Sequence, residues 1–263
     1  MTEPISGRGV LYPARLPTFH RIAAPADLGG LIRWFWIPRW NLPPGRTSRQ
    51  HLLSFPASNL VVEPSGVSLA GPTTRASYRD LSGSGWGVGA LLRPAAVPSL
   101  LADPQGVRDA LIRYDAGDLH RSIVAAMDLA DEAAARERAV EAFAAWARQR
   151  LAPPDETGLL ANAIEDLIAN DSDIVRVEQL ALQSGLTQRG VQRLAKRYVG
   201  LPPLTIIRRY RLQEAVQRLR EDGSLTIARV AADLGYADHA HLTRDFRRVL
   251  GLTPHAYRHD ARA

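Results

Sequence analysis

"LALQSGLTQRGVQRLAKRYVGLPP" (residues 180–203) and "VAADLGYADHAHLTRDFRRVLGLTP" (residues 230–254) are two copies of one pattern. Each copy has a short apolar run, a turn marked by glycine, and a second run with apolar residues at spacings of three and four. The alanine of the first run and the glycine of the turn recur in both copies, at Ala181, Gly185, Ala231 and Gly235. The pattern predicts two helix-turn-helix units, in which the small alanine lets the two helices cross closely.

The second helix of each copy places polar residues opposite its apolar stripe. In the first copy the outward residues are Arg189, Gln192, Arg193 and Lys196. In the second copy they are His241, Arg244 and Arg248. A helix that offers arginine and glutamine near its N-terminal end can enter the major groove and donate paired hydrogen bonds to base edges. The two units are therefore predicted to bind double-stranded DNA.

The second copy also contains His239 and His241, which raises the alternative of a metal or proton-transfer site. Residues two apart point about 200° apart on a helix, so these histidines cannot chelate one ion together. Zinc modules of the finger type need thiolates as well, and the chain has no cysteine. We predict no metal, no cofactor and no catalytic residue, with the aspartates of this stretch serving as turn, cap or surface residues.

Positive charge is concentrated in the last third of the chain. Residues 1–173 carry 17 Lys and Arg against 19 Asp and Glu, a net charge of −2. Residues 174–263 carry 16 against 8, a net charge of +8. This asymmetry favours a polyanion as the partner of the C-terminal part, although a solvated basic surface would give the same count.

The first hundred residues have the pattern of short strands separated by turns. The β-prone runs are "LIRWFWI", "QHLLSF", "NLVVEP", "GVSLAG", "ASYRDL" and "GWGVGALL". Turn signals such as "LPPG", "FPAS" and "EPSG" lie between them. Such spacing is typical of a small barrel or sandwich. From Pro94 onward the pattern becomes helical, most clearly over 131–151, a helix that could pair with a twin or cover the barrel.

Paired prolines in "LAPPDE" (151–156) break the chain and predict a boundary between a domain at 1–152 and a domain at 157–263. The second domain is predicted to be helical throughout. The expected helices are 157–170, 177–184, 188–199, 203–221, 226–234, 239–249 and 254–259. Glycines fall at or beside most of the breaks, as they do in C-terminal helix caps.

The stretch "GYADHAHLTRDFRRVLGLTPHAYR" (235–258) resembles the C-terminal signature of the AraC/XylS transcription regulators, and the resemblance extends over about 157–260. It implies an all-α DNA-binding domain with two helix-turn-helix units joined by a long helix, here about 203–221. The front half resembles more weakly the sensor domains of such regulators, at "RWFWIPRW", "LAGPTTR" and "GVGALLRPAAVPSLL". The implied fold class is α+β, with an N-terminal β-barrel-like (cupin-like) domain and flanking helices.

Carried over by position, the resemblance implies base contacts at Arg189, Gln192, Arg193, His239, His241 and Arg244. Two departures concern the packing and capping of the units. Ala195 stands where the family usually has phenylalanine, so the first unit is expected to pack more loosely. Arg229 stands where a glutamate would complete a capping box after Thr226.

A cluster of tryptophans in the front half is the candidate ligand site. Trp34, Trp36 and Trp86 could line an apolar pocket, or they could be ordinary core aromatics. An enzymatic metal barrel would need histidines and carboxylates clustered on adjacent strands, whereas His20, His51 and Glu63 are scattered.

We therefore expect a ligand-responsive, sequence-specific transcriptional regulator, an activator of the AraC type, that reads two successive major grooves with one chain. The alternatives are a DNA-binding regulator without a small-molecule ligand and an enzyme domain fused to a DNA-binding module. Expected partners are double-stranded DNA, a small-molecule effector and RNA polymerase, with a monomer and a homodimer both open. No apolar run approaches the roughly 18 residues of a membrane span, and we expect a cytoplasmic protein.

Overall fold

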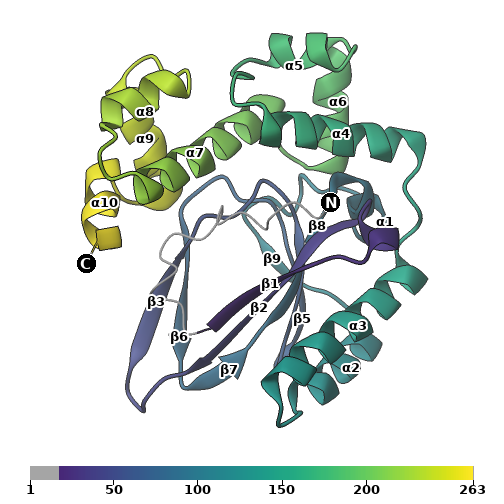
Figure 1. Cartoon of the computed structure of the whole chain (residues 1–263). Helices are drawn as coiled ribbons and strands as arrows, with labels where there is room; N and C mark the ends of the chain where they lie inside the picture. Colours follow the sequence, from purple (N-terminus) through teal and green to yellow (C-terminus); the bar gives the residue numbers. More distant parts are fainter. Residues whose placement is uncertain (1–17, 263) are drawn as a thin grey trace.

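The computed structural model of the protein describes residues 18–262, except for the side chains of Leu52 and of residues 260–262. All described strands lie within residues 18–113, and the described residues from 156 onward form helices and their connections (Figure 1). We call residues 18–151 the sheet region and residues 156–262 the helical region. None of the described helices is long and apolar enough to cross a membrane.

The main sheet of the sheet region is antiparallel, with the strand order β1-β2-β8-β4-β5-β9 and with β7 paired to the end of β2. Its strands are β1 (Thr18–Ala23), β2 (Ile32–Asn41), β4 (Asn59–Glu63), β5 (Gly66–Ala70), β7 (Ser84–Trp86), β8 (Val88–Leu92) and β9 (Leu111–Arg113). A separate two-stranded ladder joins β3 (Thr47–Leu52) to β6 (Ser77–Ser82). The β-prone runs of the sequence thus become strands, and the sequence patterns missed β1 and β9.

The main sheet is open. Within the described residues its edge strands β1 and β9 do not pair with each other, and β3 and β6 pair only together. Closure of a barrel requires every strand to find two neighbours, and β9 offers only three residues for pairing. The expected β-barrel-like, cupin-like domain is therefore not confirmed, because the sheet does not close.

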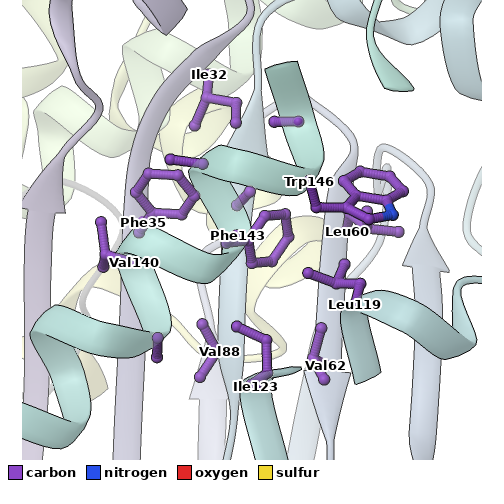
Figure 2. Close-up of a cluster of buried hydrophobic side chains, with 14 of the residues drawn as sticks. Ile32, Phe35, Leu60, Val62, Val88, Leu119, Ile123, Val140, Phe143 and Trp146 are labelled. Atoms are coloured by element: carbon purple, nitrogen blue, oxygen red, sulfur yellow. The ribbon is translucent and has the colours of Figure 1, made fainter. Parts of the chain in front are cut away.

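Two helices, α2 (Gly117–Met127) and α3 (Glu132–Arg150), cover one face of the sheet (Figure 1). Their apolar side chains meet those of the strands in the main hydrophobic core (Figure 2). The strands supply Ile32, Phe35, Leu60, Val62 and Val88, and the helices supply Leu119, Ile123, Val140, Phe143 and Trp146. Of the two roles considered for the helix at 131–151, the structure thus shows it covering the sheet.

The helical region follows the expected helices to within two residues at most ends. The sheet region also contains the short helices η2 (Ala26–Leu28), η3 (Pro94–Ala96) and α1 (Val97–Leu100). The helices of the helical region begin at Glu156. They are α4 (Glu156–Asn170), α5 (Val177–Gln183), α6 (Gln188–Tyr198), α7 (Pro203–Glu221), α8 (Ile227–Asp233), α9 (His239–Leu250) and α10 (Pro254–Arg262). Two short helix pairs, α5–α6 and α8–α9, are therefore joined by the long helix α7 (Figure 1).

The sheet and helical regions share hydrophobic cores. The loop between β3 and β4 sends Leu53 into the core of the second helix pair and Phe55 into the core of the first. The ring of Phe55 lies 5.0 Å from that of Trp34 and 6.0 Å from that of Tyr210, edge-on to each. This loop therefore packs against both helix pairs.

Charged groups reinforce this junction. Arg33 of β2 donates to Glu165 at 3.0 Å and to Asp166 at 2.7 Å, both on α4. Arg93, at the end of β8, also pairs with Asp166. Tyr210 of α7 donates to the second oxygen of Glu165 at 2.8 Å. Burial, followed by the carboxylate of Glu165, raises the pKa of Tyr210 well above its usual value, so the phenol stays protonated.

We predict that Phe55→Ala destabilises the whole chain by about 3–5 kcal/mol, because it removes a buried ring that packs against both regions. Urea unfolding followed by circular dichroism measures the change. As a control, Leu182→Ala removes a side chain that is 83% exposed and should change stability by no more than about 0.5 kcal/mol. Equal effects of the two substitutions would contradict the shared core.

Candidate nucleic-acid interface

The first helix pair, α5 and α6, is closed by a turn at Gly185 and by a cap on α6. Gly185 has φ +67°, a left-handed conformation that glycine adopts without a steric penalty. The Thr187 hydroxyl accepts a hydrogen bond from the Gly190 amide at 3.1 Å, which satisfies a free donor at the start of α6. Gly185 and Thr187 therefore determine where α6 begins and in which direction it leaves the turn.

One face of α6 is buried and the opposite face is basic. The buried residues are Gly190, Val191, Leu194, Ala195 and Tyr198. The four residues predicted to read DNA in this unit all lie exposed on the other side of the helix: Arg189, Gln192, Arg193 and Lys196. The structure thus brings together on one helix face the predicted contacts of the first unit.

A small apolar cavity of about 20 Å³ lies beside Ala195, between α4, α6 and α7. Its lining includes Leu194, Val199 and Ile206. A phenylalanine at position 195 would project into this space. The cavity agrees with the looser packing expected from the alanine.

The second helix pair, α8 and α9, is built in the same way, with a left-handed glycine (Gly235, φ +65°) in its turn. Thr226 caps α8 by accepting from the Arg229 amide at 3.1 Å. Asp238 caps α9 by accepting from the His241 amide at 2.6 Å, and this hydrogen bond lowers the pKa of Asp238. The aspartate of this turn is thus a helix cap. Arg229 makes no capping box and instead pairs with Asp233, at 2.9 Å.

The predicted DNA contacts of the second unit are less uniform than those of the first. His239 and Arg244 are exposed on α9, whereas His241 is half-buried with its ring 5.2 Å from that of Tyr236. Arg248 pairs with the buried Asp245 at 3.0 Å, and its carbonyl oxygen accepts from the amide of Ala76 in the sheet region at 3.2 Å. Arg248 is therefore exposed near Arg244 on α9, while its backbone contacts the sheet region.

Arg247 is a candidate contact that the sequence patterns did not single out. It is exposed on α9, on the same side as Arg244. The internal repeat places it opposite Lys196, which lies on the exposed face of α6. That alignment was the signal that could have identified Arg247.

The helix α7 holds the two units in a fixed relation. Its residues are buried from Ile206 onward at most positions, including polar ones such as Arg211 and Gln213. Arg211 donates from Nε to the carbonyl oxygen of Leu234 at 2.7 Å and stacks over the Tyr236 ring at 4.2 Å. These contacts attach α7 to the turn of the second unit.

The three candidate tryptophans do not meet in one place. Trp34 packs on Phe55 at the junction with the helical region, and Trp36 donates to Asn59 at 3.0 Å. Trp86 instead packs against the main core beneath α2 and α3. Trp34 and Trp36 are two residues apart on β2, whereas Trp86 belongs to a different packing environment. Residues 18–262 contain no group of three or more His, Asp or Glu side chains that could hold a metal ion.

Two family models match separate parts of the chain. Residues 180–260 match a helix-turn-helix domain family, and residues 20–107 match a domain of unknown function. The helical region thus matches a helix-turn-helix domain family, and it is similar to parts of proteins named AraC-like transcription regulators.

The relatives named for their function are transcription regulators. The chain is 38% identical over 88 residues to the F1 operon positive regulatory protein of Yersinia pestis, covering 34% of this chain and 29% of that protein. It is 32% identical over 122 residues to a putative AraC-like transcription regulator of Streptomyces antibioticus, covering 46% of this chain and 38% of that protein. The chain thus spans well under half the length of these relatives.

Among solved structures, ToxT of Vibrio cholerae aligns over 86% of this chain and 98% of its own, with 11% identity and a TM-score of 0.47.

We predict that Thr187→Ala lowers stability by about 1 kcal/mol, because the Gly190 amide loses its acceptor at the start of α6. Thr187→Ser keeps the hydroxyl and should lie within about 0.5 kcal/mol of the parent protein. Urea unfolding of both variants gives the comparison. A serine variant as unstable as the alanine variant would show that the methyl group matters instead of the cap.

Proposed function

We propose that this protein is a sequence-specific transcriptional regulator that reads two successive major grooves with one chain. The observation that carries this proposal is the pair of similar units, each with an exposed basic helix face, held on one long helix. Two reading helices about 34 Å apart, one turn of DNA, would engage one face of the duplex. Because the target is chromosomal DNA, the protein would act in the cytoplasm of a bacterial cell.

Base contacts in the first unit are assigned to Arg189, Gln192 and Arg193, with Lys196 near the phosphates. In the second unit they are assigned to His239, His241 and Arg244, and we add Arg247. Arginine donates two parallel hydrogen bonds to guanine and glutamine can do the same to adenine, so these residue types suit direct reading of bases. Arg248 is left with a contact to the phosphate backbone at most, since Asp245 already holds it.

We further propose that residues 1–152 form the sensing or assembly domain and residues 157–263 the DNA-binding domain. The open sheet, with Trp34 and Trp36 on the face turned away from α2 and α3, would receive a small-molecule effector. The Yersinia relative is named a positive regulatory protein, which supports an activator that acts with RNA polymerase. Regulation without a small ligand is the second candidate, and a thermal-shift screen of metabolites separates the two. No catalytic role is assigned to any residue.

The assignment of base contacts is tested by Arg189→Ala and Arg244→Ala. Each should weaken binding to the protein's own site by about 1–3 kcal/mol and relax base preference at one position. A selection from random duplexes first identifies that site. Competition binding with the selected and a scrambled duplex then measures the loss.

Arg197→Ala is the matched control, because Arg197 is also exposed on α6 but lies over the Tyr198 ring. It should weaken binding to both duplexes slightly and equally. If Arg189→Ala and Arg244→Ala also reduce binding to both duplexes equally, these arginines touch only phosphates and the assignment is wrong.

A further inference from the structure

The two helix-turn-helix units touch each other directly, in addition to their attachment to α7. The contact joins the loop between α4 and α5 to the turn between α8 and α9. Gly235 of that turn leaves a space into which Val175 of the loop packs. A Cβ atom added at position 235 would lie 2.8 Å from Cγ1 of Val175 and 3.7 Å from its Cβ. Carbon atoms that are not bonded pack at about 3.5–4.0 Å, so only glycine fits against this valine.

The equivalent glycine of the first unit has no such neighbour. Gly185 occupies the matching position of the repeat, and its φ is +67°, against +65° at Gly235. Outside its own chain neighbours, no atom in the described part of the chain lies within 4 Å of a Cβ added at Gly185. The left-handed turn therefore accounts for glycine at both positions, whereas the close approach of another segment occurs at Gly235 and not at Gly185.

Hydrogen bonds and core packing hold the loop between α4 and α5 in place. Oε1 of Gln179 accepts from the amides of Val175 and Arg176, at 3.0 and 2.9 Å. Its Nε2 donates to the carbonyl oxygen of Asp173 at 3.0 Å. Ile174 is 1% exposed and belongs to the core of the first unit. Val175 is therefore a fixed projection of the first unit toward the second.

The turn of the second unit is held from its other side by α7. Arg211 donates to the carbonyl oxygen of Leu234 at 2.7 Å and lies over the Tyr236 ring. The helix α9 begins just beyond this turn, at His239. A displacement of the turn relative to Val175 therefore displaces the N-terminal end of α9, where base contacts are assigned.

We propose that the contact of Val175 with Gly235 sets the spacing at which the protein reads its two DNA half-sites, with Val175 as a positioning residue. This inference rests on the proposed function. The helix α7 holds the second unit from one side, and the contact adds a second point of attachment near the start of α9. One base pair inserted between the half-sites moves the second one by about 3.4 Å and rotates it by about 35°. The contact opposes this displacement, so the protein selects one spacing.

An exchange of methyl groups across the contact gives the variants for the test. Gly235→Ala adds a carbon 2.8 Å from Cγ1 of Val175 and forces the turn and the loop apart. Val175→Ala removes the methyl group that fills the space, and the contact is lost. In the double variant the two Cβ atoms lie 3.7 Å apart, which is an ordinary van der Waals contact. Each single variant should therefore lose preference for the native spacing, and the double variant should regain it.

A selection from random duplexes with the full chain first identifies the two half-sites. Competition binding then compares the selected duplex with duplexes that have one base pair more or fewer between the half-sites. The unchanged protein should prefer the native spacing by at least about thirtyfold, because a displaced unit loses its base contacts. Gly235→Ala and Val175→Ala should each reduce this ratio by about 3- to 30-fold, within the range measured for residues in contact. The double variant should return to within about threefold of the unchanged protein.

Gly185→Ala is the matched control, because it places alanine at the same left-handed φ without a neighbouring segment. It should weaken binding at every spacing equally and leave the ratio unchanged. Val175→Ala introduces no strain, so it decides the outcome if Gly235→Ala fails to fold. A chain that selects no duplex overturns the proposed function and the spacing role together. Equal binding of the unchanged protein at all spacings, an unchanged ratio in Val175→Ala, or no recovery in the double variant overturns the spacing role alone.

Discussion

The contact of Arg33 with Glu165 and Asp166 decides how the two halves of this protein sit together. Glu165 is 4% exposed, and a carboxylate so deeply buried requires a bonded cation and further donors. Arg33 provides the charge from the sheet, and Tyr210 provides a hydrogen bond from α7. Loss of the Arg33 contact would leave the buried carboxylate of Glu165 without its cation, and loss of the Tyr210 contact would remove one of its hydrogen bonds. The position of α4 on the sheet and that of α7 on α4 therefore depend on the same side chain.

The positions of α4 and α7 determine where the two helix-turn-helix units lie. The helix α4 contacts η3 and packs within the first unit, while α7 carries the second unit through Arg211 and the Tyr236 ring. The exposed faces of α6 and α9 stay free because every apolar side of these helices already has a partner. The sheet region thus determines the relative orientation of the exposed faces of α6 and α9, although it contributes no residue to either helix.

The helical region could be predicted from sequence because its signals are local. Glycine turns, threonine and aspartate caps and the spacing of Val191, Leu194 and Tyr198 are all readable within one turn or two. Most strands of the sheet could also be predicted, although β1 and β9 could not. Whether the sheet closes could not be predicted, since closure depends on pairing between β1 and β9, which lie far apart in the chain. The contacts of Glu165 with Arg33 and of Arg209 with Thr73 could not be predicted for the same reason, because each joins residues about 130 positions apart.

The loop between β3 and β4 has a consequence for how such regulators can be recombined. Leu53 and Phe55, two positions apart, occupy the cores of different helix-turn-helix units. A chimera that joins this sheet to another protein's DNA-binding half would present both side chains to foreign surfaces, and each would have to fit at the same time. A DNA-binding half from another protein can therefore replace this one only if its two units have apolar cores that accept Leu53 and Phe55 at the same separation. A suitable linker at 151–155 does not remove this requirement.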